Sequence, residues 1–355
     1  MSDDIIVNNS IGGGLNRRVI CHNVFEKIIS LENLFLAWRE FSKGKVKKLD
    51  VLEFKANLED NIFYLHQSLR NKTYQHSYYS AFNVYDPKLR KIHKATVVDR
   101  VLHHAIYQII YSIFDKNFIY DSYSCRMEKG THRAVERLEK FTRKLSRNNK
   151  RNVFVLKCDI KKFFDSINQE ILLEIIRIKI QDENVLWLIE KIIKSFPSGL
   201  PLGNVTSQIF ANIYLNELDQ FIKHQLKEKY YLRYCDDFII LSESEEQLKN
   251  LIPQISLFLQ EKLQLTLHPN KISIRKYHQG IDFLGYVILP YYRTLRTKTK
   301  KRMISKLLLK HKMYREDLVS EESFEQSLQS YLGVLRHCAG WKIERLIRQK
   351  ASDKL

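Results

Sequence analysis

The sequence predicts an α+β fold in which an antiparallel sheet has helices packed on one of its faces. The chain has 355 residues, of which 44% are hydrophobic, so it can bury a substantial core. Several long segments have helical periodicity, whereas short apolar runs come in pairs around turn residues. The sequence contains no internal repeat and no proline- or serine-rich linker.

The first part of the chain predicts helices around one strand pair. Residues 1–18 have little apolar periodicity and are expected to form a loose arm. Aromatic and β-branched residues over 78–92, interrupted at Asp86-Pro87, indicate two strands. Apolar residues at near-helical spacing predict helices within 19–75, 98–118 and 132–145.

The second part predicts strands that end on acidic residues. A buried strand over 153–159 ends on Asp159, and the apolar runs 230–234 and 238–241 flank Asp236-Asp237 as a hairpin. Two further strands are expected at 265–274 and 281–288. Helices are expected at 168–180, 185–195, 207–222 and 245–263.

The C-terminal part is strongly basic. Between Tyr291 and Lys312 there are nine Lys or Arg residues and no acidic one, and an amphipathic region follows from Phe324 to Ile347. This pattern predicts a small helical domain with a basic face over 291–355.

Overall charge favours a polyanionic partner. The net charge is +19, which favours nucleic acid ahead of an anionic membrane surface, with a generally basic composition as the alternative. The five cysteines are far apart, so neither a disulfide framework nor a zinc site is expected. No stretch reaches the roughly 20 apolar residues that span a bilayer. We therefore expect a cytoplasmic protein that does not bind membranes.

Three carboxylates stand in apolar surroundings: Asp159, Asp236 and Asp237. Like charges in a partly dry sheet raise one another's pKa, and a divalent cation removes that penalty. Oxygen ligands suit Mg²⁺, and two such ions about 4 Å apart support in-line phosphoryl transfer. A polar hairpin turn is the alternative for the Asp-Asp pair taken alone, because Asp is common in turns.

The residues around these carboxylates resemble reverse transcriptases. Tyr234-Cys235-Asp236-Asp237 matches the Tyr-x-Asp-Asp signature, and the run from Asp159 to Ile167 resembles the first catalytic-aspartate motif. Further blocks follow in the family's order: Arg90-Lys91-Ile92, Asp99-Arg100-Val101, Tyr123-Ser124-Cys125-Arg126, Lys271 after Leu-x-Leu-His-Pro-Asn, and Phe283-Leu284-Gly285-Tyr286. The resemblance implies a right-hand polymerase, with N-terminal helices and fingers at 19–152, a palm at 153–290 and a helical thumb at 291–355.

One block departs from the common pattern. Most reverse transcriptases have glutamine and proline at the positions of Leu202 and Gln208 in the run Pro201-Leu202-Gly203-Asn204-Val205-Thr206-Ser207-Gln208. This form resembles the enzymes of diversity-generating retroelements, which copy a template-repeat RNA with errors at adenines. Leu202 offers contact area without a hydrogen-bonding group, so we expect weaker discrimination between nucleotides. A neutral packing substitution is the alternative.

The resemblance also implies roles for single residues. Asp159, Asp236 and Asp237, with the Ile160 carbonyl, would hold two Mg²⁺ ions, with Mn²⁺ as an alternative ion. The incoming dNTP would meet Arg90 at its triphosphate, Phe164 at its sugar, Lys271 at the leaving pyrophosphate, and Leu202 and Gln208 in its pocket. A basic set in the thumb would grip RNA phosphates: Arg293, Arg296, Lys298, Lys300, Lys301 and Arg302.

The function expected from this resemblance is error-prone synthesis of cDNA on a template-repeat RNA. A small, basic, helical accessory protein that forms oligomers is the expected protein partner. The alternatives are another prokaryotic reverse transcriptase, of retron, defence-associated or group II intron type, and a non-catalytic RNA-binding scaffold. The presence of all three aspartates disfavours the scaffold.

Overall fold

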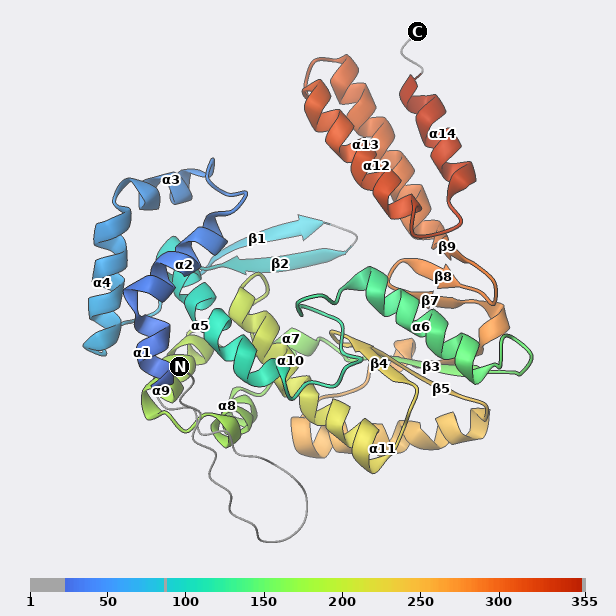
Figure 1. The fold of residues 1–355 in the computed structure, drawn as a ribbon, viewed down its shortest axis with the longest axis horizontal. Coiled ribbons are helices and arrows are strands. Elements are labelled where there is room, and N and C mark those ends of the chain that lie inside the picture. Colours follow the sequence, from blue (N-terminus) through green and yellow to red (C-terminus); the bar gives the residue numbers. More distant parts are fainter. Residues whose placement is uncertain (1–22, 86–87, 353–355) are drawn as a thin grey trace, which may run out of the picture. The chain divides into compact units, whose positions relative to one another are not determined.

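The computed structural model describes residues 23–85 and 88–352 of the chain (Figure 1). The expected N-terminal arm, residues 1–18, lies outside the described residues. The chain divides into two compact units, here called the helical unit and the sheet unit. The helical unit comprises the described residues within Met1–Tyr120, Ile160–Lys227 and Gln254–His268, and the sheet unit comprises those within Asp121–Asp159, Glu228–Pro253 and Pro269–Leu355.

The helical unit consists of helices and one exposed hairpin. Its helices are α1 (Val24–Ile29), α2 (Leu31–Ser42), α3 (Leu49–Ala56), α4 (Leu58–Arg70), α5 (Val97–Asp115), α7 (Phe163–Ser166), α8 (Gln169–Lys179), α9 (Glu183–Lys194) and α10 (Val205–Gln220), the last continued by a π-helical turn over Phe221–Gln225. Strands β1 (Ser80–Tyr85) and β2 (Leu89–Lys94) pair antiparallel. The helices and the strand pair expected here are confirmed.

Polar side chains set where helices of this unit begin. Thr96 caps α5 by accepting a hydrogen bond from the amide of Asp99, and the Thr96 hydroxyl donates to the Asp99 carboxylate at 2.6 Å. Asn168 caps α8 in the same way, accepting from two amides of its first turn. Asp182 caps α9 and also accepts from the amide of Phe25 at 3.1 Å, which ties α1 to α9.

The sheet unit holds two antiparallel sheets and a set of helices (Figure 1). The first sheet has the order β4 (Tyr231–Tyr234), β5 (Asp237–Ser242), β3 (Phe154–Asp159), β6 (Ser273–Lys276). The second has the order β7 (Ile281–Phe283), β8 (Tyr286–Ile288), β9 (Arg293–Leu295). The helices are α6 (Thr131–Leu145), α12 (Thr297–Arg315), α13 (Glu321–Leu335) and α14 (Trp341–Ser352), while α11 (Glu245–Leu263) begins here and ends in the helical unit.

One apolar core joins the parts of the sheet unit. Leu138 of α6, Val155 of β3, Ile239 of β5, Phe283 of β7 and Leu332 of α13 all belong to it and are almost fully buried. Helix α6 packs on β4 and β5, so the face of the first sheet that it covers is dry. This burial is the main source of stability for the strands that bear the aspartates.

The strands after α11 differ from the prediction. Most of the expected strand 265–274 is not a strand, and only β6, at its C-terminal end, joins the first sheet beside β3. The expected strand 281–288 is two short strands, β7 and β8, because Leu284 and Gly285 turn the chain with positive φ. The turn was not predicted, because apolar residues precede and follow it and the run reads as one continuous strand. Gly285 was the available signal, since glycine favours positive φ.

Gly199 lies where no other residue fits. Its φ is +65°, and a Cβ built there would approach the carbonyl oxygen of Phe164 and lie 2.8 Å from the Asp165 Cα. The amide of Leu200 donates to the Phe164 carbonyl at 2.8 Å, so the two segments are held in direct backbone contact. Glycine is therefore required both for conformation and for space.

We expect Gly199→Ala to destabilise the protein by about 2–4 kcal/mol, because αL strain adds to a backbone clash. The matched control is Gly44→Ala, since Gly44 has φ +68° but no atom within 4 Å of its built Cβ. The control isolates the strain, about 1–2 kcal/mol. Thermal and urea unfolding measure both variants, and equal losses would contradict the proposed close packing at Gly199.

Candidate active site

Three aspartates meet at one end of the first sheet of the sheet unit. Asp159 is the last residue of β3 and Asp237 is the first residue of β5, and the two are direct partners in the antiparallel ladder. Asp236 lies in the tight turn between β4 and β5, next to Cys235, which has φ +55°. Sequence reasoning placed Asp237 in the turn, but it belongs to the strand, where it also pairs with Tyr234.

The site concentrates negative charge in a partly dry place. Burial raises the pKa of Asp236 above its ordinary value, and the charge of Asp159 raises it further. Burial is also the largest cause at Asp237, where it raises the pKa to about 6 against the opposing effect of Lys157, and the charges of Asp236 and Asp159 add to the rise. Keeping these carboxylates ionised together therefore costs free energy, and a bound cation would lower that cost.

Two lysines offset part of this charge. The Lys271 Nζ donates to the Asp159 carboxylate at 2.5 Å, and the Lys157 Nζ lies 4.0 Å from the Asp237 carboxylate. Lys271 belongs to the short turn Pro269–Lys271 just before β6, so the β3–β6 pairing brings it to Asp159. Sequence reasoning did not identify Lys157. The signal was present, because Lys157 precedes Asp159 by two residues on one strand and so shares its face.

Buried polar contacts hold the turn that presents Asp236. Arg233 of β4 is fully buried, and its guanidinium donates to the Cys235 carbonyl and to the Ser122 hydroxyl, both at 3.1 Å. Backbone hydrogen bonds link Arg233 to Asp121 and Tyr123. The segment 121–123 therefore braces the hairpin from the side, and Arg233 is a positioning residue that the sequence analysis missed.

The chemistry of the three aspartates suits a divalent cation. Carboxylates supply hard oxygen ligands, and the raised pKa values of Asp236 and Asp237 indicate a local excess of negative charge. Within residues 23–85 and 88–352, no group of three or more His, Cys, Asp and Glu side chains is placed so that it could hold a metal ion as it stands. Asp159 is instead turned toward Lys271, so metal binding would require that ion pair to open or be shared.

Of the expected nucleotide residues, Lys271 lies in the sheet unit, and the others lie in the helical unit: Arg90, Phe164, Leu202 and Gln208. The amide of His93 in β2 donates to the Leu202 carbonyl at 2.9 Å. Gly203 has φ +112°, and a Cβ built there would lie 2.7 Å from the Ile92 side chain. Phe164 is half-buried and its ring packs edge-on against Phe163. Backbone hydrogen bonds thus connect the segment 199–202 to Phe164 on one side and to β2 on the other.

Other expected residues have less defined surroundings. Arg90 is exposed on β2, and Gln208 is exposed on the first turns of α10. Ile160 is buried and forms an isolated bridge with Leu267, within the helical unit.

The expected thumb contacts fall into two groups. Arg293 donates to the His337 carbonyl and lies 3.3 Å from Glu139, and Arg296 pairs with Asp282, so both guanidinium groups are engaged inside the sheet unit. Lys298, Lys300 and Lys301 are exposed on α12, and Arg302 is half-buried. The exposed lysines are therefore the better placed of the six for phosphate contacts.

In EDTA, we expect Asp237→Asn to raise the free energy of unfolding by about 1–2 kcal/mol at pH 7.5, because it removes one buried like charge. The gain should shrink as pH falls through about 6, since folded wild type then binds a proton that the unfolded chain still releases. Denaturation against pH measures this. Glu325→Gln, an exposed carboxylate of the same unit, is the control. A loss of stability in Asp237→Asn would contradict the charge argument.

Among the described residues, no helix is both long enough and apolar enough to cross a bilayer.

Comparison with known proteins identifies the family. The protein YkfC of Escherichia coli is 24% identical over 255 residues, which cover 59% of this chain and 66% of that protein. The group II intron-encoded protein LtrA of Lactococcus lactis is 27% identical over 321 residues, covering 69% of this chain and 51% of its own. The chain therefore spans between half and two thirds of the length of these relatives.

Solved structures similar to this chain include telomerase from Candida albicans in complex with a fragment of telomeric RNA. It is 12% identical, has a TM-score of 0.46, and covers 75% of this chain and 56% of its own. Residues 85–288 match the family described as reverse transcriptase (RNA-dependent DNA polymerase), a span that includes all three aspartates, and the chain belongs to that family.

Proposed function

We propose that this chain is an RNA-directed DNA polymerase, a nucleotidyltransferase that adds dNTPs to a primer on an RNA template. The observation that supports it most directly is the meeting of Asp159, Asp236 and Asp237 at one sheet end, with burial and mutual repulsion raising the pKa of two of them. Such a cluster suits divalent cations, which this family uses. We propose two Mg²⁺ ions, with Mn²⁺ as a substitute.

The roles of the chain's own residues follow from their chemistry. When bound, the metal ions would lower the pKa of the attacking 3′-hydroxyl and stabilise charge on the leaving oxygen. Asp159, Asp236 and Asp237 would hold these metal ions in place, and the Ile160 carbonyl is a further proposed ligand. Lys271 is close enough to Asp159 to exchange between that carboxylate and the departing pyrophosphate, to which it can donate a proton.

Recognition of substrate and template falls to other residues in this proposal. Arg90 is exposed and its planar guanidinium suits the dNTP triphosphate, while the Phe164 ring would clash with a ribose 2′-hydroxyl. Lys298, Lys300 and Lys301 supply exposed charge for the RNA–DNA duplex, with Arg302 beside them. Arg293 and Arg296 support the fold of that region through their internal contacts.

Primer extension tests the general proposal. The purified chain, given an RNA template, a DNA primer, dNTPs and Mg²⁺, is expected to make cDNA, and Asp236→Ala to lower the rate on the order of 10³-fold or more, about 4 kcal/mol of barrier. Asp60→Ala, an exposed acid of α4, is the matched control and should retain the wild-type rate. Equal rates for the wild type and Asp236→Ala would rule out the aspartate site as the catalytic centre.

We further propose that the enzyme belongs to a diversity-generating retroelement and copies a template-repeat RNA with errors at adenines. The support is the resemblance of the block from Pro201 to Gln208, in which Leu202 stands at the glutamine position of the usual reverse-transcriptase motif. A small, basic, oligomeric accessory protein is the partner proposed from the same resemblance. A cytoplasmic location follows from this assignment, because the RNA of a prokaryotic element is made there.

A group II intron type is the second candidate, because LtrA, at 27% identity, is a group II intron-encoded protein. The retron and defence-associated types share the same chemistry. The error spectrum separates these candidates from the first: errors gathered opposite template adenines support the diversity-generating type, whereas evenly distributed, rare errors support the others. A chain that binds RNA but never extends a primer, with or without an accessory protein, would support a non-catalytic scaffold.

Leu202→Gln tests the proposed cause of infidelity. Restoring an amide to the pocket is expected to lower misincorporation opposite adenine by about tenfold, the effect of one added discriminating hydrogen bond. Sequencing of the cDNA measures this, with Leu202→Met as the control that keeps an apolar side chain of similar volume. The same error rate in wild type and Leu202→Gln would show that Leu202 is a neutral packing substitution.

A further inference from the structure

A pocket of about 200 Å³ in the helical unit has four cationic side chains in its wall. It lies among the loop before α3, the hairpin β1–β2, helix α5 and the start of α10. The cationic residues are Lys45, Lys48, Lys94 and Arg100, and the imidazoles of His103 and His104 lie beside them. Phe41, Phe82 and Ile92 add apolar surface, and Gly203, Asn204 and Val205 complete the wall. The last three residues directly follow Leu202, which we proposed as a nucleotide contact.

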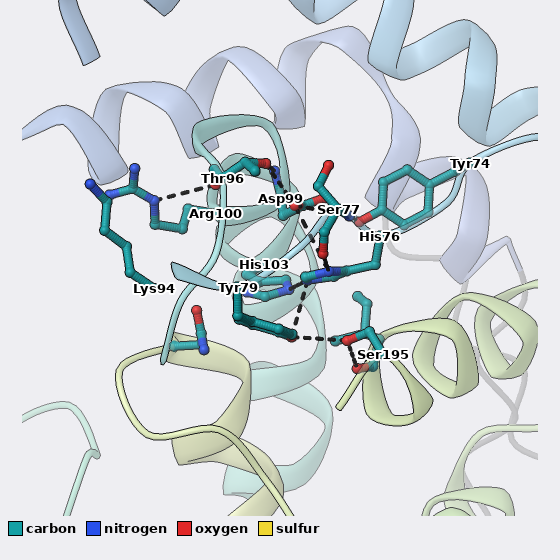
Figure 2. Close-up of polar contacts among 12 residues, drawn as sticks. Tyr74, His76, Ser77, Tyr79, Lys94, Thr96, Asp99, Arg100, His103 and Ser195 are labelled. Atoms are coloured by element: carbon teal, nitrogen blue, oxygen red, sulfur yellow. Dashed lines mark hydrogen bonds and ion pairs between the residues drawn. The ribbon is translucent and has the colours of Figure 1, made fainter. Parts of the chain in front are cut away.

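The positive charge of this pocket is only partly balanced. Lys94 and Arg100 share a single carboxylate, that of Asp50, at 2.7 and 2.5 Å (Figure 2 shows the two cations side by side). The Lys45 Nζ donates to the Phe41 carbonyl, and both Lys45 and Arg100 lie over the Phe41 ring, 4.7 and 4.8 Å from its centre. Burial lowers the pKa of Lys45, and the charges of Arg100 and Lys48 lower it further. An anion would relieve this repulsion.

Two buried polar atoms of the wall have no hydrogen-bond partner among the described residues. Asn204 is 2% exposed, and its Nδ2 donates to the His93 carbonyl, so the atom left over is the acceptor Oδ1. In the described part of the chain, this Oδ1 has no partner, and neither does the Nδ1 of His103, which is 1% exposed.

The His103 ring stacks on the ring of His76, with the two ring centres 5.2 Å apart. The His103 Nε2 lies 3.2 Å from the His76 Nε2, so the ring nitrogen of His103 that has no partner among the described residues is Nδ1 (Figure 2). Burial holds the pKa of His103 well below its usual range, which keeps the ring neutral.

We propose that this pocket, here called the fingers pocket, holds the ribose-phosphate of one unpaired nucleotide of the RNA template. The phosphate lies among Lys45, Lys94 and Arg100, and the 2′-hydroxyl donates to Asn204 Oδ1, the buried acceptor that has no partner among the described residues. One RNA nucleotide supplies both the anion and, on its ribose, the hydroxyl donor, whereas DNA lacks the 2′-hydroxyl. The assignment rests on the proposed function, since it names the template as the ligand.

Equilibrium binding tests the fingers pocket without catalysis. Fluorescence anisotropy, in EDTA and without dNTPs, measures the dissociation constant of a primer–template duplex with an RNA overhang. The unmodified duplex is compared with a series in which one 2′-deoxynucleotide is placed in turn at each overhang position. A second series adds a neutral methylphosphonate at that same nucleotide. At a single overhang position we expect the deoxy change to weaken binding by the wild type, and the methylphosphonate to weaken it on the order of tenfold more, the loss of one charge-assisted hydrogen bond.

The variants connect this position to the pocket. Lys45→Gln should lose the methylphosphonate effect at that position and reduce the salt slope of binding by about 0.7, the value for one phosphate of a single strand. Lys43→Gln is the matched control, because Lys43 belongs to the same loop, is exposed and pairs with Glu40 outside the pocket. Unfolding curves confirm that both variants fold. Lys94→Gln provides a second variant should Lys45→Gln prove unstable.

Three results would overturn the proposal. One is a methylphosphonate effect that is equal at all positions, and another is a single-position effect that persists in Lys45→Gln and Lys94→Gln. The third is sensitivity of the variants only to dNTP or inorganic phosphate, which would make the pocket a site for free phosphate. Primer extension is measured separately, so an inactive chain that shows the single-position effect would contradict the proposed polymerase and leave the RNA site standing.

Discussion

The register of β3 against β5 is the constraint on which the candidate active site depends. It sets Asp159 directly opposite Asp237 and brings Asp236, in the adjoining turn, beside them. A shift by one residue would turn these carboxylates to the other face of the sheet. The apolar residues of β3 and β5, buried against α6, prevent that shift, so the core of the sheet unit fixes the geometry of its most polar site.

The helical unit solves a different problem, which is to hold a loop without regular secondary structure in one conformation. The segment from Gly199 to Asn204 makes backbone hydrogen bonds to Phe164 and His93 and side-chain contacts through Asn204. Positive φ at Gly199 and Gly203 lets the chain approach these neighbours closely. The Leu202 side chain is therefore presented by a fixed backbone, so its chemistry, rather than loop motion, is expected to decide what it selects.

Much of this arrangement could be predicted from the sequence, because periodicity reports which faces are buried. The helices and the strand ending on Asp159 follow from apolar spacing, and the β1–β2 pair follows from its aromatic and β-branched residues. The short strands β7 and β8 could not be separated, since Leu284 continues the apolar run through their turn. The sharing of Asp50 by Lys94 and Arg100 could not be predicted either, because contacts between residues far apart in sequence leave no local pattern.

The two units keep opposite kinds of unbalanced charge. The sheet unit gathers carboxylates whose pKa values are raised, and the helical unit gathers basic groups, of which the pKa of Lys45 is lowered and that of His104 falls to about 4, mainly through burial. Each arrangement lowers the stability of the unliganded chain, and each is relieved by a ligand of the opposite sign. Nucleotidyl transfer on a polynucleotide requires both kinds of ligand. A cation acts on the reacting phosphates, and the template is itself the polyanion. The residues that weaken the fold are thus the ones proposed to bind these ligands.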